Sequence, residues 1–149
     1  MRAPLLLLVL AASGLAAELH LDSAPVAANT PAALSLHLEA GESALTGVQF
    51  EVEYDASRFD VKLEIGPAAE IAVKVLQSNT LQPGKQRVLI FGFNRNKIGD
   101  GVVAIAHVML KGALDEQSYP IRISAPAATS AEGQAVPITG TGGSVATKD

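Results

Sequence analysis

Two glutamates in one short segment have the residue type and spacing for acid and base chemistry. In residues 46–54 (TGVQFEVEY), Glu51 and Glu53 lie two positions apart, which on a strand places both carboxylates on one face, about 7 Å apart. Glycosidases hold their two catalytic carboxylates at comparable separations. Catalysis also requires one carboxyl group to be desolvated while the other stays ionised. Neighbouring glutamates on a strand are ordinarily solvated, so we interpret this pair as a solvated face and predict no enzyme activity.

The other residue types that bind metals or attack substrates are scattered. His20, His37 and His107 are isolated, and no spacing gives a metal two ligands from one element, so we expect them to be solvent-exposed or structural. Residues 94–101 (NRNKIGDG) place Ile98 where a calcium loop requires an oxygen ligand. There is no cysteine, and no serine lies in a nucleophile-elbow sequence. The sequence predicts no catalytic residue, no metal site and no cofactor.

Charge argues against several kinds of partner. The chain has 15 acidic and 11 basic residues, a net charge of −4 with neutral histidines. Binding to nucleic acid depends on clustered basic residues that displace phosphate counterions, and no such cluster is present. The same absence argues against an anionic membrane surface. We therefore expect no nucleic acid as a partner.

The N-terminus has the organisation of a secretory signal peptide. In residues 1–17 (MRAPLLLLVLAASGLAA), Arg2 precedes an apolar run that ends in small residues. The run is shorter than the about 20 residues that a membrane-spanning helix needs, and no second long apolar segment follows. We predict export to a periplasm or the cell exterior, with residues 18–149 as a single domain that has no membrane span. Without cysteine, the hydrophobic core must stabilise it.

Beyond the leader, apolar residues recur with a period of two, which is typical of strands. Turn-forming clusters separate eight or nine such segments, and this spacing indicates an antiparallel β-sandwich. The runs 88–93 and 102–106 alternate less and suit central strands that are covered on both sides or lie near the middle of the sandwich. A buried helix also fits their periodicity, but their β-branched and aromatic residues favour strands. Residues 121–137, rich in Ala and Pro, favour a loop. The predicted strands are 18–22, 34–40, 46–54, 59–65, 70–76, 87–93, 101–112 and 119–124, with short pieces near Val136 and over 144–146.

The order of these landmarks resembles the bacterial cohesin domain. The resemblance rests on Tyr54-Asp55 at the end of a strand, Asp100-Gly101 before a long hydrophobic strand, and a Gly-rich closing segment, 132–145. It implies a nine-stranded jelly-roll sandwich that serves as a receptor, in the best-known members for a dockerin carried by a polysaccharide-degrading enzyme. Tyr54 can bury its ring while its hydroxyl reaches a partner at the sandwich edge, and Asp55 can accept backbone hydrogen bonds in a turn.

The polar side of the strand 46–54 is the candidate interface. Dockerin-binding cohesins carry an Asn and an Asp where this chain has Gly47 and Gln49. We predict a secreted, non-catalytic module whose partner is another secreted or envelope protein, dockerin-like if the family role applies. The predicted partner-binding residues are Gln49, Glu51, Glu53, Arg87, Asn94 and Arg95.

Two other functions remain open. A carbohydrate-binding module stacks sugar rings on exposed aromatic side chains, but Trp is absent, and Phe50, Tyr54, Phe91 and Phe93 are predicted to lie in the core. Polysaccharide therefore stays an alternative ligand. An exported sandwich can also be a structural subunit of an envelope assembly that associates through its edge strands.

Overall fold

The computed structural model describes residues 17–27, 30–41, 43–111 and 117–147. The predicted leader lies outside these ranges except for Ala17, the first residue of β1. No helix in the ranges has the length and apolar character needed to cross a bilayer. The elements are β1 (Ala17–Leu21), β2 (Ala24–Val26), β3 (Ala32–Glu39), β4 (Leu45–Glu53), β5 (Phe59–Ile65), α2 (Pro67–Ile71), β6 (Val75–Gln82), β7 (Lys85–Phe91), β8 (Gly101–Leu110), β9 (Ser118–Ser130), β10 (Ala135–Val136), β11 (Ile138–Thr141) and β12 (Gly143–Thr147).

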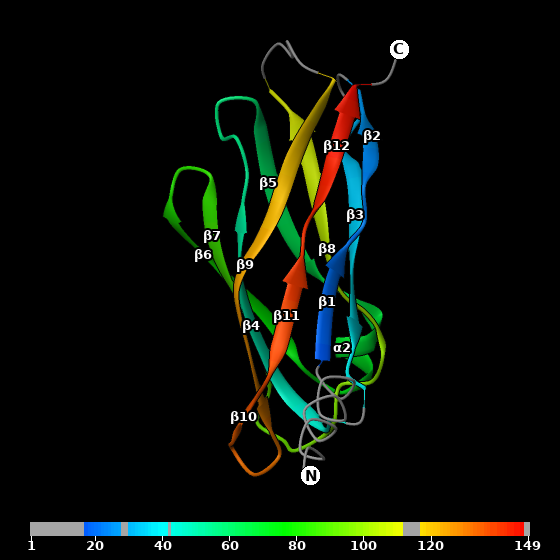
Figure 1. The fold of residues 1–149 in the computed structure, drawn as a ribbon, viewed down its shortest axis with the longest axis vertical. Coiled ribbons are helices and arrows are strands. Elements are labelled where there is room, and N and C mark those ends of the chain that lie inside the picture. The colour runs from blue at the N-terminus through cyan, green and yellow to red at the C-terminus, as the bar shows by residue number, and fades with distance from the viewer. Residues whose placement is uncertain (1–16, 28–29, 42, 112–116, 148–149) are drawn as a thin grey trace, which may run out of the picture.

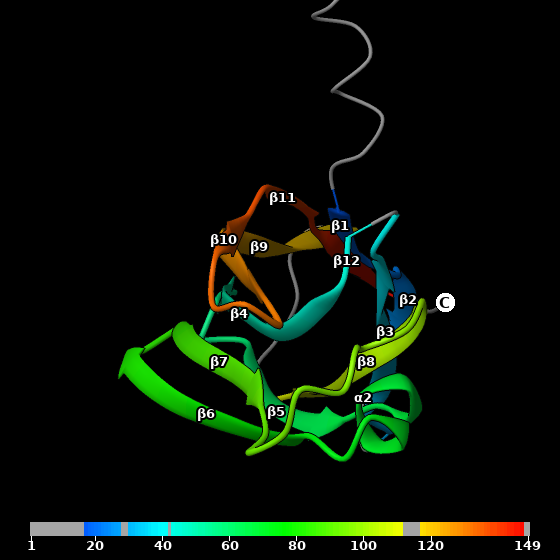
Figure 2. The same ribbon diagram turned by 90° about the horizontal axis from the view of Figure 1, so that it is seen from below.

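The strands form two sheets that pack face to face (Figures 1 and 2). The first, which we call the β3 sheet, has the order β11-β1-β3-β8-β5, and the second, the β4 sheet, has the order β2-β12-β9-β4-β7-β6 with β10 attached to β9. The neighbours are antiparallel except for β1 with β11 and β2 with β12, which are parallel. The predicted all-β sandwich is confirmed, although the described residues form more strands than the nine expected, because β2, β10 and β11 are short additional strands of two to four residues.

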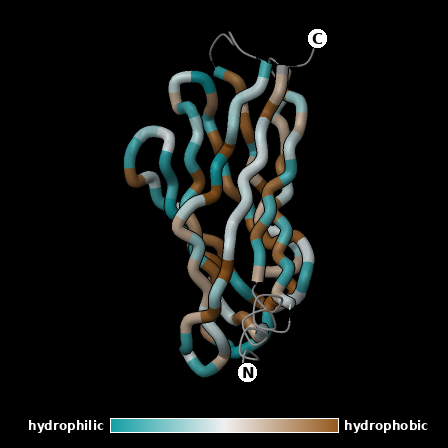
Figure 3. Tube along the Cα trace, in the orientation of Figure 1, coloured by the Kyte–Doolittle hydropathy of each residue, from teal (hydrophilic) through white to brown (hydrophobic). Residues whose placement is uncertain are grey.

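The apolar residues that recur at every second position form the buried inner face of each sheet. β3 shows this most clearly, because its leucines are buried while the residues between them are half-buried or exposed. Figure 3 shows hydrophobic and hydrophilic residues alternating along the strands. Each fully buried side chain of this size contributes about 1.5–3 kcal/mol. The largest fully buried side chains are Phe50, Phe59, Leu19, Leu34, Leu36, Leu38, Leu45, Ile90, Ile98, Ile121, Val52 and Val88.

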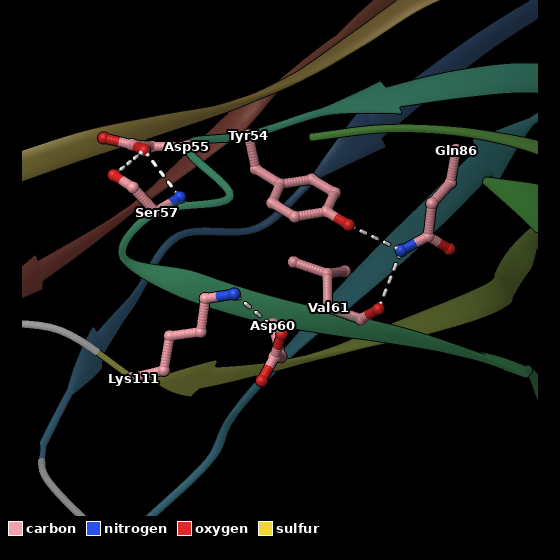
Figure 4. A network of polar contacts seen from close by, with 7 residues as sticks. All are labelled: Tyr54, Asp55, Ser57, Asp60, Val61, Gln86 and Lys111. Atoms are coloured by element: carbon pink, nitrogen blue, oxygen red, sulfur yellow. Dashed lines mark hydrogen bonds and ion pairs between the residues drawn. The ribbon is translucent and has the colours of Figure 1, made fainter. Parts of the chain in front are cut away.

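The buried side-chain amide of Gln86 on β7 connects Tyr54, the residue after β4, with β5 of the other sheet. The Gln86 side chain donates hydrogen bonds to the Tyr54 hydroxyl (2.9 Å) and to the Val61 carbonyl of β5 (2.8 Å), as Figure 4 shows. The tyrosine hydroxyl therefore accepts a hydrogen bond within the fold. Asp55 accepts hydrogen bonds from the backbone N–H (3.0 Å) and the hydroxyl (2.6 Å) of Ser57, which confirms its predicted role in a turn.

The prediction of a strand over residues 70–76 is wrong for all but its last two residues, Val75 and Leu76, which begin β6. Gly66 precedes the short helix α2, and Pro67 is its first residue, where proline's fixed φ suits the first turn. Ala69 is fully buried, and the helix packs on β8. The chain then turns through Val73, whose φ of 61° is rare for a β-branched residue. The alternating Ile71, Val73 and Val75 are therefore exposed and do not mark a buried face.

The prediction of a loop over residues 121–137 is also wrong for most of its length. β9 continues to Ser130 and pairs with β4 on both sides of a bulge. Ala125 has a φ of 49° at this bulge, and Pro126, which lacks an N–H, follows it where the ladder is interrupted. Ala and Pro, which we interpreted as loop residues, are accommodated here as bulge residues within a strand.

Gly66 allows a close approach between α2 and β8, and we expect Gly66→Ala to destabilise the fold. An added Cβ would lie 2.5 Å from the Val102 carbonyl oxygen and 2.8 Å from the Val103 carbonyl carbon, neither of which can move aside alone. Overpacking of this kind costs about 1–3 kcal/mol of unfolding free energy, measurable by denaturant titration. Gly99→Ala is the matched control, because nothing lies within 4 Å of its added Cβ. Equal midpoints and slopes for the two variants would contradict this packing.

Candidate functional site

The outer surface of the β4 sheet, which we call the β4 face, collects the predicted polar residues in rows. Cross-strand register places Arg87 of β7 and Ser124 of β9 opposite Glu51 of β4. In the next row Lys85 and Arg122 flank Glu53. On the other side of Glu51, Leu89 and Ala127 flank Gln49, which is exposed. Three strands therefore contribute to one continuous surface, as the sequence predicted for β4 and its neighbour.

Glu51 is not the solvated carboxylate that the sequence predicts. It is 9% exposed, because two cations of β7 lie over it. Arg87 Nη2 donates to Glu51 Oε2 at 3.0 Å, and Lys85 Nζ lies 3.5 Å from Oε1. The hydrogen bond from Arg87 lowers the pKa of Glu51, with a smaller opposing effect of burial. The register of β7 on β4, which brings the cations to this position, is not visible in the sequence of β4.

These contacts also argue against acid and base chemistry at the glutamate pair. A general acid of a glycosidase needs a raised pKa, whereas the pKa of Glu51 is lowered. Glu53 accepts a hydrogen bond from the Ser124 hydroxyl at 2.7 Å, which joins β4 to β9. Both carboxylates are engaged in contacts that hold neighbouring strands together.

The lowered pKa predicts an acid-sensitive contribution to stability. A carboxyl group whose folded pKa lies below its unfolded value, 4.5 for Glu51, stabilises the fold above that value and loses this contribution as pH falls through the folded pKa. We therefore expect the unfolding free energy of the wild type to fall more steeply than that of Glu51→Gln between about pH 6 and about pH 3. Asp55, whose pKa is lowered by its hydrogen bonds from Ser57, is common to both proteins. Parallel curves from chemical denaturation at each pH would contradict the assignment.

An apolar hollow adjoins the charged rows. Its volume is about 160 Å³, and small residues at Gly47 and Ala127 leave the space over β4 and β9. On β7, the half-buried Leu89 and Phe91 form its wall. The lining residues are Gly47, Val48, Gln49, Leu89, Ile90, Phe91, Ala127, Ala128 and Thr129. The prediction that the apolar run 88–93 is covered on both sides is wrong, because no described element covers the outer face of β7.

Exposed hydrophobic side chains extend the hollow beyond the end of β7. Val75 of β6 lies opposite Phe91 and is 53% exposed. Phe93 is fully exposed, and its ring meets that of Phe91 edge-on, with centroids 6.2 Å apart. The prediction that both rings lie in the core is wrong, because β7 ends at Phe91 and the alternation of the strand does not continue to Phe93. Phe50 is buried as predicted, and Tyr54 is half-buried.

The remaining two predicted residues, Asn94 and Arg95, lie in the segment after β7 and not on the sheet. Asn94 Oδ1 accepts a hydrogen bond from Lys74 Nζ at 2.7 Å, and its amide nitrogen donates to the Val73 carbonyl at 3.1 Å. Lys74 is 5% exposed, and burial lowers its pKa. Asn94 therefore supports the turn at Val73, while Arg95 is exposed.

Charge is distributed unequally between the two sides of the sandwich. The rows on the β4 face combine the carboxylates of Glu51 and Glu53 with three cations, Lys85, Arg87 and Arg122. On the opposite side, the strands β1, β3 and β5, with the residue after β1, carry five carboxylates and one lysine among their described residues. These are Glu18, Asp22, Glu39, Asp60, Glu64 and Lys62. The β4 face is thus the less acidic side of an acidic protein.

Two of the three histidines and residues 94–101 have contacts within the fold, and His20 is exposed. His37 Nε2 lies 3.1 Å from Asp22 Oδ2, and His107 Nε2 lies 2.7 Å from Glu64 Oε1. Ile98 is buried, and Asp100 Oδ1 accepts a hydrogen bond from the Ala40 N–H at 2.9 Å. Within the ranges that the structure describes, no three His, Asp or Glu side chains are grouped so as to hold a metal ion.

Comparison with known proteins gives a fold and no close relative. No protein-family model and no curated protein matches the sequence. Among solved structures, the sixth cohesin of Acetivibrio cellulolyticus scaffoldin B, in complex with a Cel5 dockerin mutant, has a TM-score of 0.76 at 22% identity, covering 89% of this chain and 99% of that chain.

Two further solved structures are similar to this chain over most of its length. The Coh-OlpA–Doc918 cohesin–dockerin complex of Clostridium thermocellum gives a TM-score of 0.77 at 17% identity, with coverage of 89% and 99%. A non-cellulosomal cohesin of the archaeon Archaeoglobus fulgidus gives 0.72 at 12% identity, with coverage of 90% and 92%. The chain therefore has a cohesin-like fold, as the landmarks in its sequence predict.

Proposed function

We propose that this chain is an exported, non-catalytic receptor module that binds another secreted or envelope protein through the β4 face. The observation that carries this proposal is the apolar hollow beside the charged rows. Contiguous apolar surface rimmed by polar residues is typical of protein-binding sites, and the centre of such sites is usually a pocket that receives an apolar anchor. Leu89 and Phe91 of β7 provide that pocket here.

The similar structures support a protein partner. Several of the matching cohesins were solved in complex with dockerins, and a dockerin-like module is accordingly the first partner to consider for this chain. The resemblance places Gly47 and Gln49 where dockerin-binding members carry Asn and Asp. In this chain both residues line the hollow. We infer that its partner inserts an apolar side chain at this position, where those cohesins make polar contacts.

Polysaccharide binding is a second candidate, favoured by the fully exposed ring of Phe93 and the half-buried ring of Phe91 beside it. The predicted burial of these rings is the main argument from the sequence against binding of a polysaccharide. The two rings are nearly perpendicular, with 90° between their planes, whereas two coplanar rings would form a flat platform for successive sugars. The geometry therefore favours a protein ligand over a polysaccharide chain.

Affinity capture distinguishes the two candidates. The immobilised chain, starting at Ala17 because this buried residue begins β1, is exposed to the source organism's secreted and envelope proteins, and bound proteins are identified by mass spectrometry. A parallel sample is tested on insoluble polysaccharide. Enrichment of one protein, lost when the hollow is altered, supports the proposal. Retention on polysaccharide with no protein enriched would replace the proposal with the second candidate.

A further inference from the structure

β6 is an edge strand without the charge and proline that normally protect an edge from pairing with another chain, and its ladder with β7 is regular from Val75 to Thr80. The register shifts only between Thr80 and Gln82, next to the hairpin turn. Its eight residues, Val75–Gln82 (VLQSNTLQ), include no charged residue, no proline and no glycine. All of them except Leu76 are exposed. On one side β6 pairs with β7, and on its other side no described strand lies. A long edge with free backbone donors and acceptors is a template for a further strand, and proteins normally block such edges with charge, proline, bulges or short length.

The other edges of the same molecule are blocked in these ways. β5, the long edge of the β3 sheet, exposes the charged residues Asp60, Lys62 and Glu64. The opposite edges are formed by β11, with four residues, and β2, with three. Among the described strands, β6 is therefore the one long edge that exposes no charge.

The shape of the molecule leaves this edge accessible. Figures 1 and 2 show the β6–β7 hairpin projecting from the body of the sandwich, with β6 on its outer side. The hairpin turns at Pro83 and Gly84, and Gly84 has a φ of 83° that glycine adopts without strain. β5 approaches β6 within the sandwich, but no described strand pairs with the free edge of β6.

We propose that a second copy of this chain pairs with β6, antiparallel and across a two-fold axis at Ser78. Val75, Gln77 and Asn79 point to the β4 face, because they lie opposite Phe91, Leu89 and Arg87 of β7. Residues that lie directly opposite in an antiparallel pair share a face. An axis at Ser78 satisfies this condition and sets Gln77 opposite Asn79 of the second copy, within the regular part of β6 that precedes the register shift after Thr80.

Composition identifies a second copy as the occupant. Two β6 strands bring no like charges together, because β6 has no charged residue. The proposed register sets amide opposite amide. It also keeps both β4 faces on the same side of a joined sheet, because the axis is perpendicular to that sheet. The dimer presents two copies of the proposed receptor surface side by side, which adds avidity for a partner with two docking modules.

A single cysteine tests the axis. The chain contains no cysteine, so Ser78→Cys introduces one thiol per copy. At a two-fold axis the two thiols lie opposite each other, with Cα atoms about 4.5–5.5 Å apart, a separation that a disulfide can bridge. We expect mild oxidation to convert Ser78→Cys to a covalent dimer at least tenfold faster than Lys62→Cys, the matched control on the charged edge strand β5. Equal rates for the two variants would overturn the proposal.

Charge pairs test the register without a covalent bond. Gln77→Lys with Asn79→Glu places opposite charges against each other across the axis, whereas Gln77→Lys with Asn79→Lys places like charges there. Both changes are at exposed positions. In sedimentation equilibrium from micromolar to millimolar protein, we expect the like-charge variant to dimerise at least tenfold more weakly than the opposite-charge variant. A wild-type chain that stays monomeric throughout this range, or equal dissociation constants for the two variants, would overturn the proposal.

Discussion

Leu89→Asp is expected to weaken binding of the captured protein at least about thirtyfold, equivalent to about 2 kcal/mol. Leu89 lines the apolar hollow, lies opposite Gln49 and is half-buried on the outer side of β7. An aspartate there places a charge where the partner's apolar anchor must be desolvated, and the cost of burying an unpaired carboxylate opposes association. Titration calorimetry with the purified partner measures the effect.

Two further variants define the control for this prediction. Met109→Asp makes the same chemical change on β8 of the opposite sheet, at a side chain 37% exposed, and should leave affinity unchanged. Gln49→Trp adds bulk over the hollow at an exposed position and should reproduce the loss without adding charge. Affinity that is insensitive to both changes in the hollow, or more sensitive to Met109→Asp, would place the binding surface elsewhere.

Phe50→Ala is expected to lower the free energy of unfolding by about 3–5 kcal/mol, while Phe93→Ala should change it by less than about 0.5 kcal/mol. Phe50 is fully buried at the centre of β4, so its truncation leaves a cavity between the sheets. Phe93 is fully exposed after the end of β7, so its truncation removes little packing. Denaturant titrations of the two variants against the wild type measure both values.

The same pair of variants separates stability from binding. If the β4 face docks a partner near Phe91, Phe93→Ala should reduce affinity while leaving the fold intact, because the two rings are in contact. A large loss of stability in Phe93→Ala would mean that this ring packs in the core, as the sequence alone predicts. A stability change below about 1 kcal/mol in Phe50→Ala would contradict the position of the core.

The sequence predicts the parts of the fold in which one face of a strand is buried and the other is wet. β3, β4 and β5 have that pattern, and all three were predicted within a few residues. β6 was missed, because polar uncharged residues on an exposed edge have no alternation to detect. The length of β9 was missed because a bulge absorbs Ala125 and Pro126 within a strand. In both cases the pairing partner, which lies far away in the sequence, decides the structure.

The candidate site was predicted only in part, because its other contacts also depend on strand pairing between residues far apart in the sequence. Gln49, Glu53 and Arg87 share the predicted surface, because alternation along β4 and adjacency of β7 suffice to place them. The burial of Glu51 depends on the register that brings Lys85 and Arg87 over it. The apolar hollow was not predicted, although a signal existed: β7 lacks alternation, which indicates either a strand covered on both sides or an exposed apolar face. Only the three-dimensional arrangement distinguishes these two interpretations.

Hydroxyl-radical footprinting of the chain with and without its captured partner tests the receptor surface most directly. Side chains on both sides of the sandwich are available as reporters: Leu89, Phe91 and Phe93 on or beside the β4 face, and Met109, which oxidises readily to the sulfoxide, on the β3 sheet. The proposed function predicts that the partner protects the first three residues and leaves oxidation of Met109 unchanged. Protection of Met109 with undiminished oxidation of Phe91 and Phe93 would contradict it and assign binding to the opposite sheet.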